Sequence, residues 1–383
     1  MKKIVTFGEV MIRFSPPGLN RVVQSLPGSI EASYGGAEAN AAVQIAMLGG
    51  NVDFVSSLPV GSVGDSCVNY LKGLGVNINS VVRSELGCMG AYYLETGANQ
   101  RPSVVEYHRT GSTFSLLQKR HYNWENFLTG AEWILISGVT PAISKVASEA
   151  VMDAIETANK VGVKVCFDLN YRMKLWRWNP KFTPIQLASK ILAQCIHKSD
   201  LVIGNEQVFC NVLGISTKTP NGDLTKRSTD LARQIIKSFP NLSYVALNMR
   251  EILSATHNRF GLTFYHKERD ISFLAPSDET GYVPYEIGNI VDRVGAGDAL
   301  AGALLYGMCN LDTFDYQQVA EFAAAAGCLS HSIVGDFSFI NREEIENLLT
   351  GNSLGGVVRE IYLIKSQSGD EYVLDFIWIF FRH

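Results

Sequence analysis

The sequence predicts an α/β fold in which helices cover both faces of a largely parallel central sheet. Three observations lead to this prediction. Short apolar runs alternate with longer amphipathic ones, the short runs are rich in valine, isoleucine and leucine, and no internal repeat interrupts the 383 residues. A β-then-α alternation favours parallel strands, and near-continuous apolar strands are typical of a sheet buried on both faces.

The elements follow from the same two periodicities, in order from the N-terminus. The predicted strands are the short apolar runs Ile4–Phe7, Val52–Ser56, Trp133–Ser137, Val163–Asp168, Leu201–Ile203, Tyr244–Leu247 and Leu262–Tyr265. The predicted helices are the amphipathic or small-residue stretches Ala37–Leu48, Asp65–Leu74, Ser144–Val161, Pro184–His197, Ser228–Ser238, Gly297–Cys309 and Gln317–Ser330.

Two stretches break the alternation. Residues 12–34 are rich in proline, glycine and serine, and residues 88–115 contain patches of period two such as Val104–Arg109. Such patterns favour β-hairpins, and long loops without a function are uncommon in compact domains. We therefore predict that both stretches form a small β-sheet that projects from the α/β body as a lid. Plain surface loops are the alternative.

The composition argues against several classes of protein. A net charge of −4 with 46% hydrophobic and 18% charged residues is ordinary for a soluble globular chain and predicts neither nucleic acid nor an anionic membrane as partner. The seven cysteines are dispersed without metal-ligand spacing, which indicates reduced thiols and a cytoplasmic location. The apolar run after the basic N-terminus is too short for a signal peptide, and no segment has the length of a membrane span.

The most informative motif is Asp292–Asp298, with the sequence DRVGAGD. Gly295 and Gly297 bracket Ala296, Asp298 follows at once, and a helix of small residues begins. A glycine turn that opens a helix directs several backbone N–H groups and the helix dipole at one anion. A carboxylate beside that anion is placed to take a proton from an attacking hydroxyl, which is the layout of a phosphoryl-transfer site. In isolation, an ordinary loop with an Asp N-cap would be the better interpretation.

Two further stretches supply possible walls of such a site. Gly35 and Gly36 allow the backbone to approach a ligand closely, and Asn40 in the helix that follows can hydrogen-bond a polyol hydroxyl. Asp168–Arg172 lies at the carboxyl end of a strand, where open α/β sheets bind ligands. Arg172 could grip a carboxylate there. The alternatives are a tight turn and a solvated loop.

The predicted lid carries three more candidates. Alternation along a strand places Tyr107 and Arg109 on the same face, and Tyr92 lies in the same stretch. If that face looks inward, these side chains close on a small, polar, anionic substrate. If it looks outward, they are ordinary strand residues.

These motifs, in this order, resemble those of the ribokinase-like (PfkB) carbohydrate kinases. Residues 35–40 are similar to the N-terminal signature of the family, and residues 292–298 are similar to its C-terminal signature, D-x-x-G-A-G-D. The resemblance spans about residues 1–350. It implies one kinase domain over that range, built as a three-layer α/β/α sandwich with a small β-sheet lid, followed by a C-terminal extension over residues 351–383.

Residues 137–142, residues 168–176 and the lid pattern Tyr107-x-Arg109 are similar to the 2-keto-3-deoxygluconate kinases. The resemblance implies transfer of the ATP γ-phosphoryl group to the 6-hydroxyl of this sugar acid. Asp298 would be the general base, the amides of residues 295–297 would stabilise the γ-phosphoryl group, and Mg²⁺ would bridge phosphate oxygens. The implied substrate contacts are Gly35, Gly36, Tyr92, Tyr107, Arg109 and Arg172. With Asn40 and the implied base Asp298, they make up the predicted substrate site.

The nucleotide side departs from the family pattern. The family usually carries N-x-x-E, but Asn205 is followed at +3 by Val208, and Glu206 is the only acid nearby. Glu206 is therefore the candidate metal ligand. A Lys-rich segment is replaced by residues 248–252, which makes Arg250 a candidate phosphate contact. The predicted ATP-binding residues are Asn205, Arg250, Gly295 and Gly297.

Several further points stay open at the level of sequence. The resemblance implies a homo-oligomer formed through the lid, and it leaves open whether a monovalent cation takes part. Residues 376–381 form an apolar run past the usual end of the family. Two alternative functions remain: a kinase of the same family for a neutral sugar such as fructose or tagatose, and a sugar-acid sensor on the same fold that no longer turns over.

Overall fold

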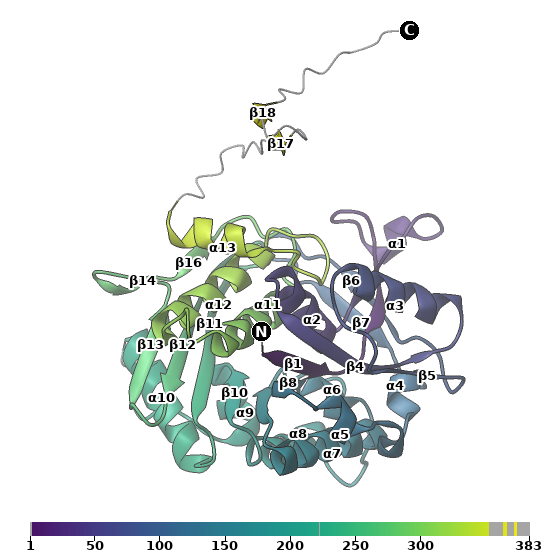
Figure 1. The fold of residues 1–383 in the computed structure, drawn as a ribbon, viewed down its shortest axis with the longest axis horizontal. Coiled ribbons are helices and arrows are strands. Elements are labelled where there is room, and N and C mark those ends of the chain that lie inside the picture. The colour runs from purple at the N-terminus through teal and green to yellow at the C-terminus, as the bar shows by residue number, and fades with distance from the viewer. Residues whose placement is uncertain (1, 222, 352–362, 366–370, 374–383) are drawn as a thin grey trace.

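A ten-stranded, mostly parallel sheet forms the centre of this computed structural model (Figure 1), which describes residues 2–221, 223–351, 363–365 and 371–373. Its strand order is β13-β12-β11-β10-β9-β8-β1-β4-β5, and β16 pairs with β12. The strands from β11 to β5 are parallel, whereas β12, β13 and β16 pair in antiparallel fashion at one side. The strands are β1 (Lys3–Phe7), β4 (Asn51–Pro59), β5 (Val81–Ser84), β8 (Ala131–Ser137), β9 (Lys164–Asp168), β10 (Leu201–Gly204), β11 (Tyr244–Ser254), β12 (His257–His266), β13 (Ile271–Ala275) and β16 (Tyr285–Ile287).

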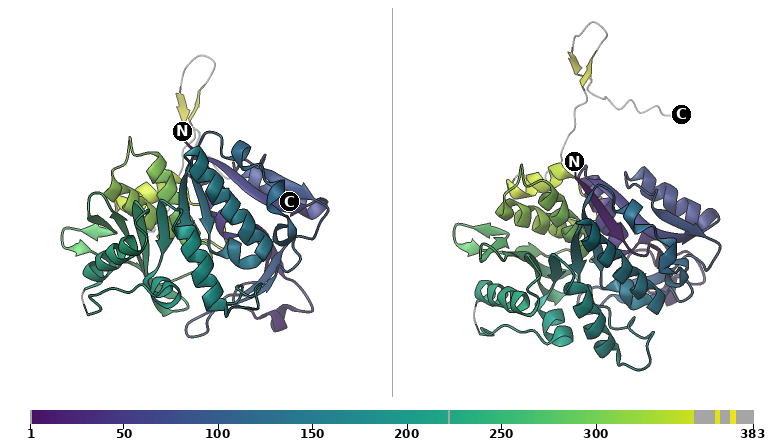
Figure 2. Two further views of the ribbon diagram at one scale, coloured as in Figure 1. Left: turned by 90° about the horizontal axis from the view of Figure 1, so that it is seen from below. Right: turned by 60° about the horizontal axis from the view of Figure 1, so that its bottom comes forward.

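Helices cover both faces of this sheet, as Figures 1 and 2 show. One face packs against α2 (Ala37–Met47), α3 (Ser62–Gly73), α11 (Ala296–Cys309), α12 (Tyr316–Ser330) and α13 (Arg342–Leu349). The other packs against α4 (Thr113–Leu116), α5 (Trp124–Phe127), α6 (Val139–Ile143), α7 (Lys145–Val161), α8 (Pro184–Ile196), α9 (Glu206–Leu213) and α10 (Leu224–Ser238). Successive residues of one strand supply the two cores in turn: Trp133 and Leu135 face the first set of helices, whereas Ile134 and Ile136 face the second. The predicted three-layer α/β/α sandwich is confirmed.

A separate four-stranded sheet confirms the predicted lid. Its order is β3-β2-β6-β7, formed by β3 (Glu31–Gly35), β2 (Met11–Ser15), β6 (Ala91–Glu95) and β7 (Val104–His108). These strands come from the two stretches that break the β-then-α alternation. Along β7, Val105 and Tyr107 are less exposed than their neighbours, and the buried Arg109 continues that face. The inward-facing alternative for Tyr107 and Arg109 is therefore the one that the structure adopts.

All the predicted strands and helices overlap an observed element of the same type. The largest boundary difference is in β11 and β12, which extend past the predicted runs as a long antiparallel hairpin. The two strands pair with each other along these extensions, which keeps them in the sheet although their sequences lack an apolar pattern. The remaining short elements are α1 (Val22–Ser25), η1 (Lys119–His121), β14 (Ser277–Asp278), β15 (Gly281–Tyr282), β17 (Leu363–Lys365) and β18 (Glu371–Val373).

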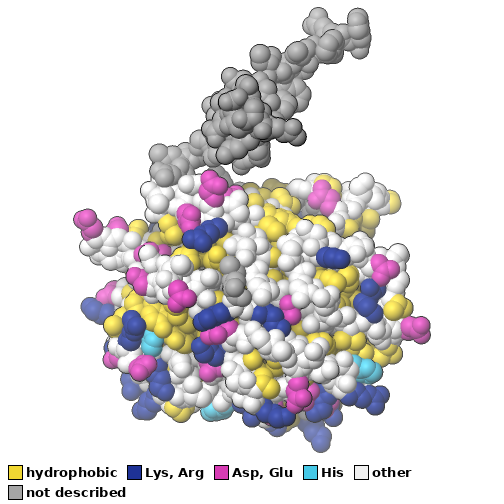
Figure 3. Space-filling model, in the orientation of Figure 1, with side chains coloured by type: hydrophobic (Ala, Val, Ile, Leu, Met, Phe, Trp, Pro, Cys, Tyr) yellow, Lys and Arg dark blue, Asp and Glu magenta, His cyan; other side chains and the backbone are white. Residues whose placement is uncertain are grey.

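Charges of both signs are interspersed over the face of the molecule seen in Figure 3. Within the described ranges, no helix is both long enough and apolar enough to cross a bilayer. The apolar run at residues 376–381, and most of the predicted extension over residues 351–383, lie outside the described residues.

Candidate active site

A cleft of about 510 Å³ lies between the lid and the carboxyl ends of the central strands. The lid contributes its inward-facing side chains, and the sheet contributes the residues that follow β9, β10 and β11. The starts of α2 and α11 also reach the cleft wall. Of the residues singled out from the sequence, the cleft brings together Gly36, Asn40, Tyr92, Tyr107, Arg109, Arg172, Asn205, Arg250, Gly295, Gly297 and Asp298.

Three of the predicted site residues are not in the cleft wall. Gly35 lies behind it, where a Cβ atom would collide with the carboxylate of Asp336. Ala296 is buried as the first residue of α11. Glu206 begins α9 and forms an ion pair of 2.7 Å with Arg227. The interpretation of Glu206 as a metal ligand therefore finds no support in the geometry.

The glycine turn has the backbone that the sequence requires of it. Gly295 is the N-cap of α11 and has a φ of +90°, in the left-handed region that favours glycine. A Cβ atom there would collide with the carbonyl oxygen of Asp336. Asp292 steadies the approach to the turn, because its Oδ1 accepts a hydrogen bond of 3.1 Å from the Val294 amide. The first amides of α11 are thus presented at the cleft, as an anion site requires.

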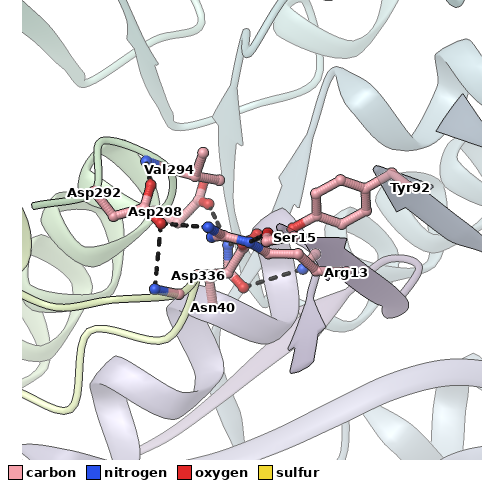
Figure 4. Close-up of polar contacts among 10 residues, drawn as sticks. Arg13, Ser15, Asn40, Tyr92, Asp292, Val294, Asp298 and Asp336 are labelled. Atoms are coloured by element: carbon pink, nitrogen blue, oxygen red, sulfur yellow. Dashed lines mark hydrogen bonds and ion pairs between the residues drawn. The ribbon is translucent and has the colours of Figure 1, made fainter. Parts of the chain in front are cut away.

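Asp298 lies next to the glycine turn, at the N-terminal end of helix α11 (Figure 4). Asn40 Nδ2 donates a hydrogen bond of 2.7 Å to Asp298 Oδ2, and Asn40 Oδ1 accepts one of 3.0 Å from the Gly36 amide. Burial raises the pKa of Asp298 well above its usual value; the Asn40 hydrogen bond opposes this, and the charge of Asp168 adds to it. A carboxylate with a raised pKa is a better proton acceptor near neutral pH than an ordinary aspartate.

Three guanidinium groups line the same cleft, those of Arg172, Arg250 and Arg293. Arg172 is exposed and forms no ion pair within the described parts of the chain. Arg250 is exposed to solvent, but its guanidinium is enclosed by surrounding residues. This enclosure is the main cause that lowers the pKa of Arg250, and the charges of Arg293 and Arg172 lower it further. Burial also lowers the pKa of Arg293. Like charges crowded around one cleft favour the binding of an anion, because the anion relieves their repulsion.

Arg109 differs from these three arginines. Its Nη2 lies 2.5 Å from Glu9 Oε2, and both side chains are buried. Arg109 and Arg172 were both predicted as substrate contacts, but they differ in charge. Arg109 is ion-paired with Glu9, whereas Arg172 forms no ion pair among the described residues and acts on Asp168 and Asp298 only through its longer-range charge.

A buried network that sequence reasoning missed joins the lid to the glycine turn. Arg13 of β2 lies 2.5 Å from Asp292 Oδ2 through Nη2 and 2.9 Å from Asp336 Oδ1 through Nη1. The hydroxyl of Tyr92 donates a hydrogen bond of 2.6 Å to Asp336 Oδ1. Burial by itself lowers the pKa of Arg13, but the charges of Asp292 and Asp336 outweigh it and raise the pKa. Figure 4 shows these side chains around Asp336, next to Asn40 and Asp298.

The nucleotide side of the cleft is less regular. Asn205 Oδ1 caps α9 by accepting a hydrogen bond of 3.0 Å from the Val208 amide. Val208 lines the cleft, so an acid at this position would have faced the cleft. Among the described residues, no group of three or more His, Cys, Asp or Glu side chains has the geometry of a metal site. The side chains present would suit a Mg²⁺ ion held chiefly by phosphate oxygens and water.

Comparisons with known proteins agree with this geometry. The family model "pfkB family carbohydrate kinase" matches residues 1–237. The chain is 28% identical to the 2-dehydro-3-deoxygalactonokinase of Haloferax volcanii, over 92% of this chain and 98% of the relative. It is 28% identical to the 5-dehydro-2-deoxygluconokinase of Clostridium tetani, over 86% of this chain and 88% of that relative. The crystal structure of 2-dehydro-3-deoxygluconokinase from Thermotoga maritima superposes with a TM-score of 0.81 at 39% identity, over 92% of this chain and 100% of that one.

Proposed function

The chain belongs to the PfkB family of carbohydrate kinases, and from this premise we propose that it phosphorylates 2-keto-3-deoxygluconate at the 6-hydroxyl with ATP. The substrate is the acid also called 2-dehydro-3-deoxygluconate. The kinase domain extends over about residues 1–350. Kinases of this family use ATP and a divalent metal.

The observation that carries the choice of an acid is Arg172, which lines the cleft, is exposed and forms no ion pair among the described residues. A neutral sugar would leave this charge without a partner, whereas a carboxylate accepts two parallel hydrogen bonds from a guanidinium. Relatives named as kinases of dehydro-deoxy sugar acids support the same choice. They also make the galactonate epimer the nearest competing acid.

Different residues of the cleft bind the sugar acid and accept the proton. Tyr92, Tyr107 and Arg172 hold the sugar acid so that its 6-hydroxyl lies next to Asp298. Asp298 takes the hydroxyl proton as the oxygen forms its bond to the γ-phosphorus and the bond to the ADP oxygen breaks.

The backbone amides at Gly295 and Gly297 stabilise the charge on the transferred group, and Arg250 binds the nucleotide phosphates. Mg²⁺, when bound, neutralises charge on the phosphate oxygens. The lid excludes water, which suppresses hydrolysis of ATP.

A homo-oligomer formed through the lid and a cytoplasmic location belong to the proposal as its finer parts. The first has a structural argument, because β3 and β7 are the two edges of the lid sheet and residues 31–33 of β3 are exposed. An unpaired edge strand can pair with another copy. Light scattering after size exclusion tests this: a strictly monomeric protein at assay concentration would contradict it.

A substrate panel tests the proposed activity. ADP release is measured with ATP and Mg²⁺ for 2-keto-3-deoxygluconate, its galactonate epimer, 5-dehydro-2-deoxygluconate, fructose and tagatose. We expect the highest kcat/KM for 2-keto-3-deoxygluconate. A neutral sugar at the head of the panel would overturn the choice of an acid, and binding of the acid without turnover of any sugar would favour the sensor.

Asp298→Asn tests the proposed base. We expect its kcat to fall by roughly 10²–10⁴, the usual contribution of general acid–base catalysis, with KM for both substrates changed little. A variant as fast as the wild type would remove Asp298 from this role.

A further inference from the structure

The ion pair between Glu9 and Arg109 lies where the body joins the lid. Glu9 is in the connection between β1 and β2, and Arg109 directly follows β7. Arg109 Nε donates a hydrogen bond of 2.7 Å to Glu9 Oε2, and Arg109 Nη2 lies 2.5 Å from the same oxygen. Glu9 is 3% exposed and Arg109 5% exposed. The pair is therefore a buried contact, and it positions Arg109 in the cleft wall.

Each partner keeps one polar atom without a hydrogen bond among the described residues. These atoms are Arg109 Nη1 and Glu9 Oε1. A buried donor without a partner is costly, so an Nη1 group left open on a cleft-lining side chain indicates an acceptor supplied by a ligand. Tyr107 lies beside it, with its ring centroid 5.6 Å from the guanidinium carbon of Arg109.

The charge of this pair differs from that of Arg172. Glu9 neutralises Arg109, so the pair acts as a dipole whose attraction for a second carboxylate is weak. The exposed Arg172 keeps its full charge. A neutralised guanidinium still donates a directional hydrogen bond, which suits a keto or hydroxyl oxygen as well as a carboxylate.

We propose that Glu9 determines which part of the sugar acid each arginine recognises. By neutralising and orienting Arg109, Glu9 directs Arg109 Nη1 to an uncharged oxygen of the sugar and leaves the carboxylate to Arg172. This inference rests on the proposed function and deepens it, since it divides recognition of the acid between two arginines.

The test compares 2-keto-3-deoxygluconate with 3-deoxyfructose, in which a hydroxymethyl group replaces the carboxylate. The quantity measured is the discrimination, meaning kcat/KM for the acid divided by kcat/KM for the neutral analogue. Arg172→Gln should lower the discrimination by about tenfold or more, as expected for a hydrogen-bonded charge pair. Arg109→Gln should lower kcat/KM for both substrates and change the discrimination by less than about threefold.

Glu9→Gln is the decisive variant. It restores the full charge of Arg109, so the discrimination in favour of the acid should rise by about threefold or more, as expected when a charge is no longer neutralised. A pair that serves only to hold the lid would lower kcat/KM for both substrates equally and leave the discrimination unchanged. The matched control is Asp53→Asn, which disrupts the ion pair of 3.2 Å with Lys3 elsewhere on the body and should leave the discrimination as it is.

The outcomes separate the two proposals. A wild type that shows no preference for any sugar acid refutes the proposed function itself. A wild type that prefers the acid refutes only the inference if Glu9→Gln leaves the discrimination unchanged, or if Arg109→Gln lowers it as much as Arg172→Gln does. If Glu9→Gln is poorly folded, the double variant Glu9→Gln/Arg109→Gln replaces it, because it places two amides where the ion pair was. This double variant should show the same discrimination as Arg109→Gln. A discrimination as low as that of Arg172→Gln would overturn the inference.

Discussion

Replacing Arg13 with methionine removes the guanidinium that pairs with both Asp292 and Asp336. All three side chains are at most 4% exposed. Methionine keeps much of the volume and the flexible chain of arginine but leaves two buried carboxylates without their counter-charge. The substitution therefore separates the electrostatic role of Arg13 from its packing.

The expected cost is large. Breaking a buried ion pair by removing one partner costs about 3–5 kcal/mol, and the two abandoned carboxylates place Arg13→Met at the upper end of that range. A chain of this size should then lose on the order of 10 °C in Tm. The free energy of unfolding of most domains is about 5–15 kcal/mol, so the variant should still fold.

The loss of stability caused by Arg13→Met should increase as the pH rises. Burial already raises the pKa of Asp336, and Arg13 opposes that rise. Without Arg13, the pKa of Asp336 in the folded protein moves further above its unfolded value. The folded state then binds the proton more strongly than the unfolded chain, so stability falls as the pH rises through the folded pKa. The destabilisation caused by Arg13→Met should be smaller at pH 5 than at pH 8.

The chain contains a matched control on its surface. Arg259 also pairs with two carboxylates, those of Glu251 and Glu286, but its side chain is 43% exposed. Exposed pairs typically contribute about 0–1 kcal/mol, so Arg259→Met should change Tm little at either pH. Thermal and urea unfolding of both variants measures the difference. A cost below about 1 kcal/mol for Arg13→Met, several-fold less than the loss of a buried partner usually causes, would refute the reasoning.

Three further predictions concern the cleft. Gly295→Ala should lower kcat by about 100-fold or more, because a Cβ atom there would collide with the Asp336 carbonyl oxygen beside the cleft. Gly162→Ala is the control: its φ of +80° gives similar backbone strain, but no atom lies near its Cβ, so kcat should stay within about twofold. Equal kcat values for the two variants would contradict this. Burial raises the pKa of Asp168 to about 7, and its charge raises that of Asp298. In a profile of kcat against pH, activity should fall as the pH drops through the raised Asp298 pKa, and Asp168→Asn should move this limb to lower pH; an unmoved limb would argue against the coupling. Arg250→Gln should raise KM for ATP by about tenfold and leave KM for the sugar acid unchanged, and an unaltered KM for ATP would exclude Arg250 from phosphate binding.

The fold could be predicted because local patterns determine it. Strand β8 alternates its contacts between two cores, yet it reads as one apolar run, which is what burial on both faces requires. The turn at Gly295 could also be predicted, because the two glycines and the start of the helix that follows lie within the seven residues 292–298. These signals need no knowledge of what lies opposite them in space.

The residues that sequence reasoning missed depend on distant partners. Glu9 contacts a residue 100 positions away, and Arg13 contacts residues 279 and 323 positions away. A single charged residue in or beside a short strand gives no sign of its partner, and one sequence holds no record of paired changes. Arg109 lies in the cleft wall, as the inward-facing alternative for the lid requires, but its neutralisation by Glu9 follows only from the fold.

The buried network around Asp336 also links the lid to the glycine turn at Gly295. Arg13 and Tyr92 belong to the lid, whereas Asp292 and Asp336 belong to the body on either side of Gly295. The Gly295 backbone lies close against the Asp336 carbonyl oxygen, and the Gly335 amide donates a hydrogen bond of 3.3 Å to Asp292 Oδ2, so a shift of Asp336 would disturb the packing of the turn. Lid strands that move away from the body would take Arg13 and Tyr92 with them and release both aspartates. We therefore expect the amides of α11 to reach their catalytic arrangement only while the lid contacts are made, which ties formation of the anion site to exclusion of water from the cleft.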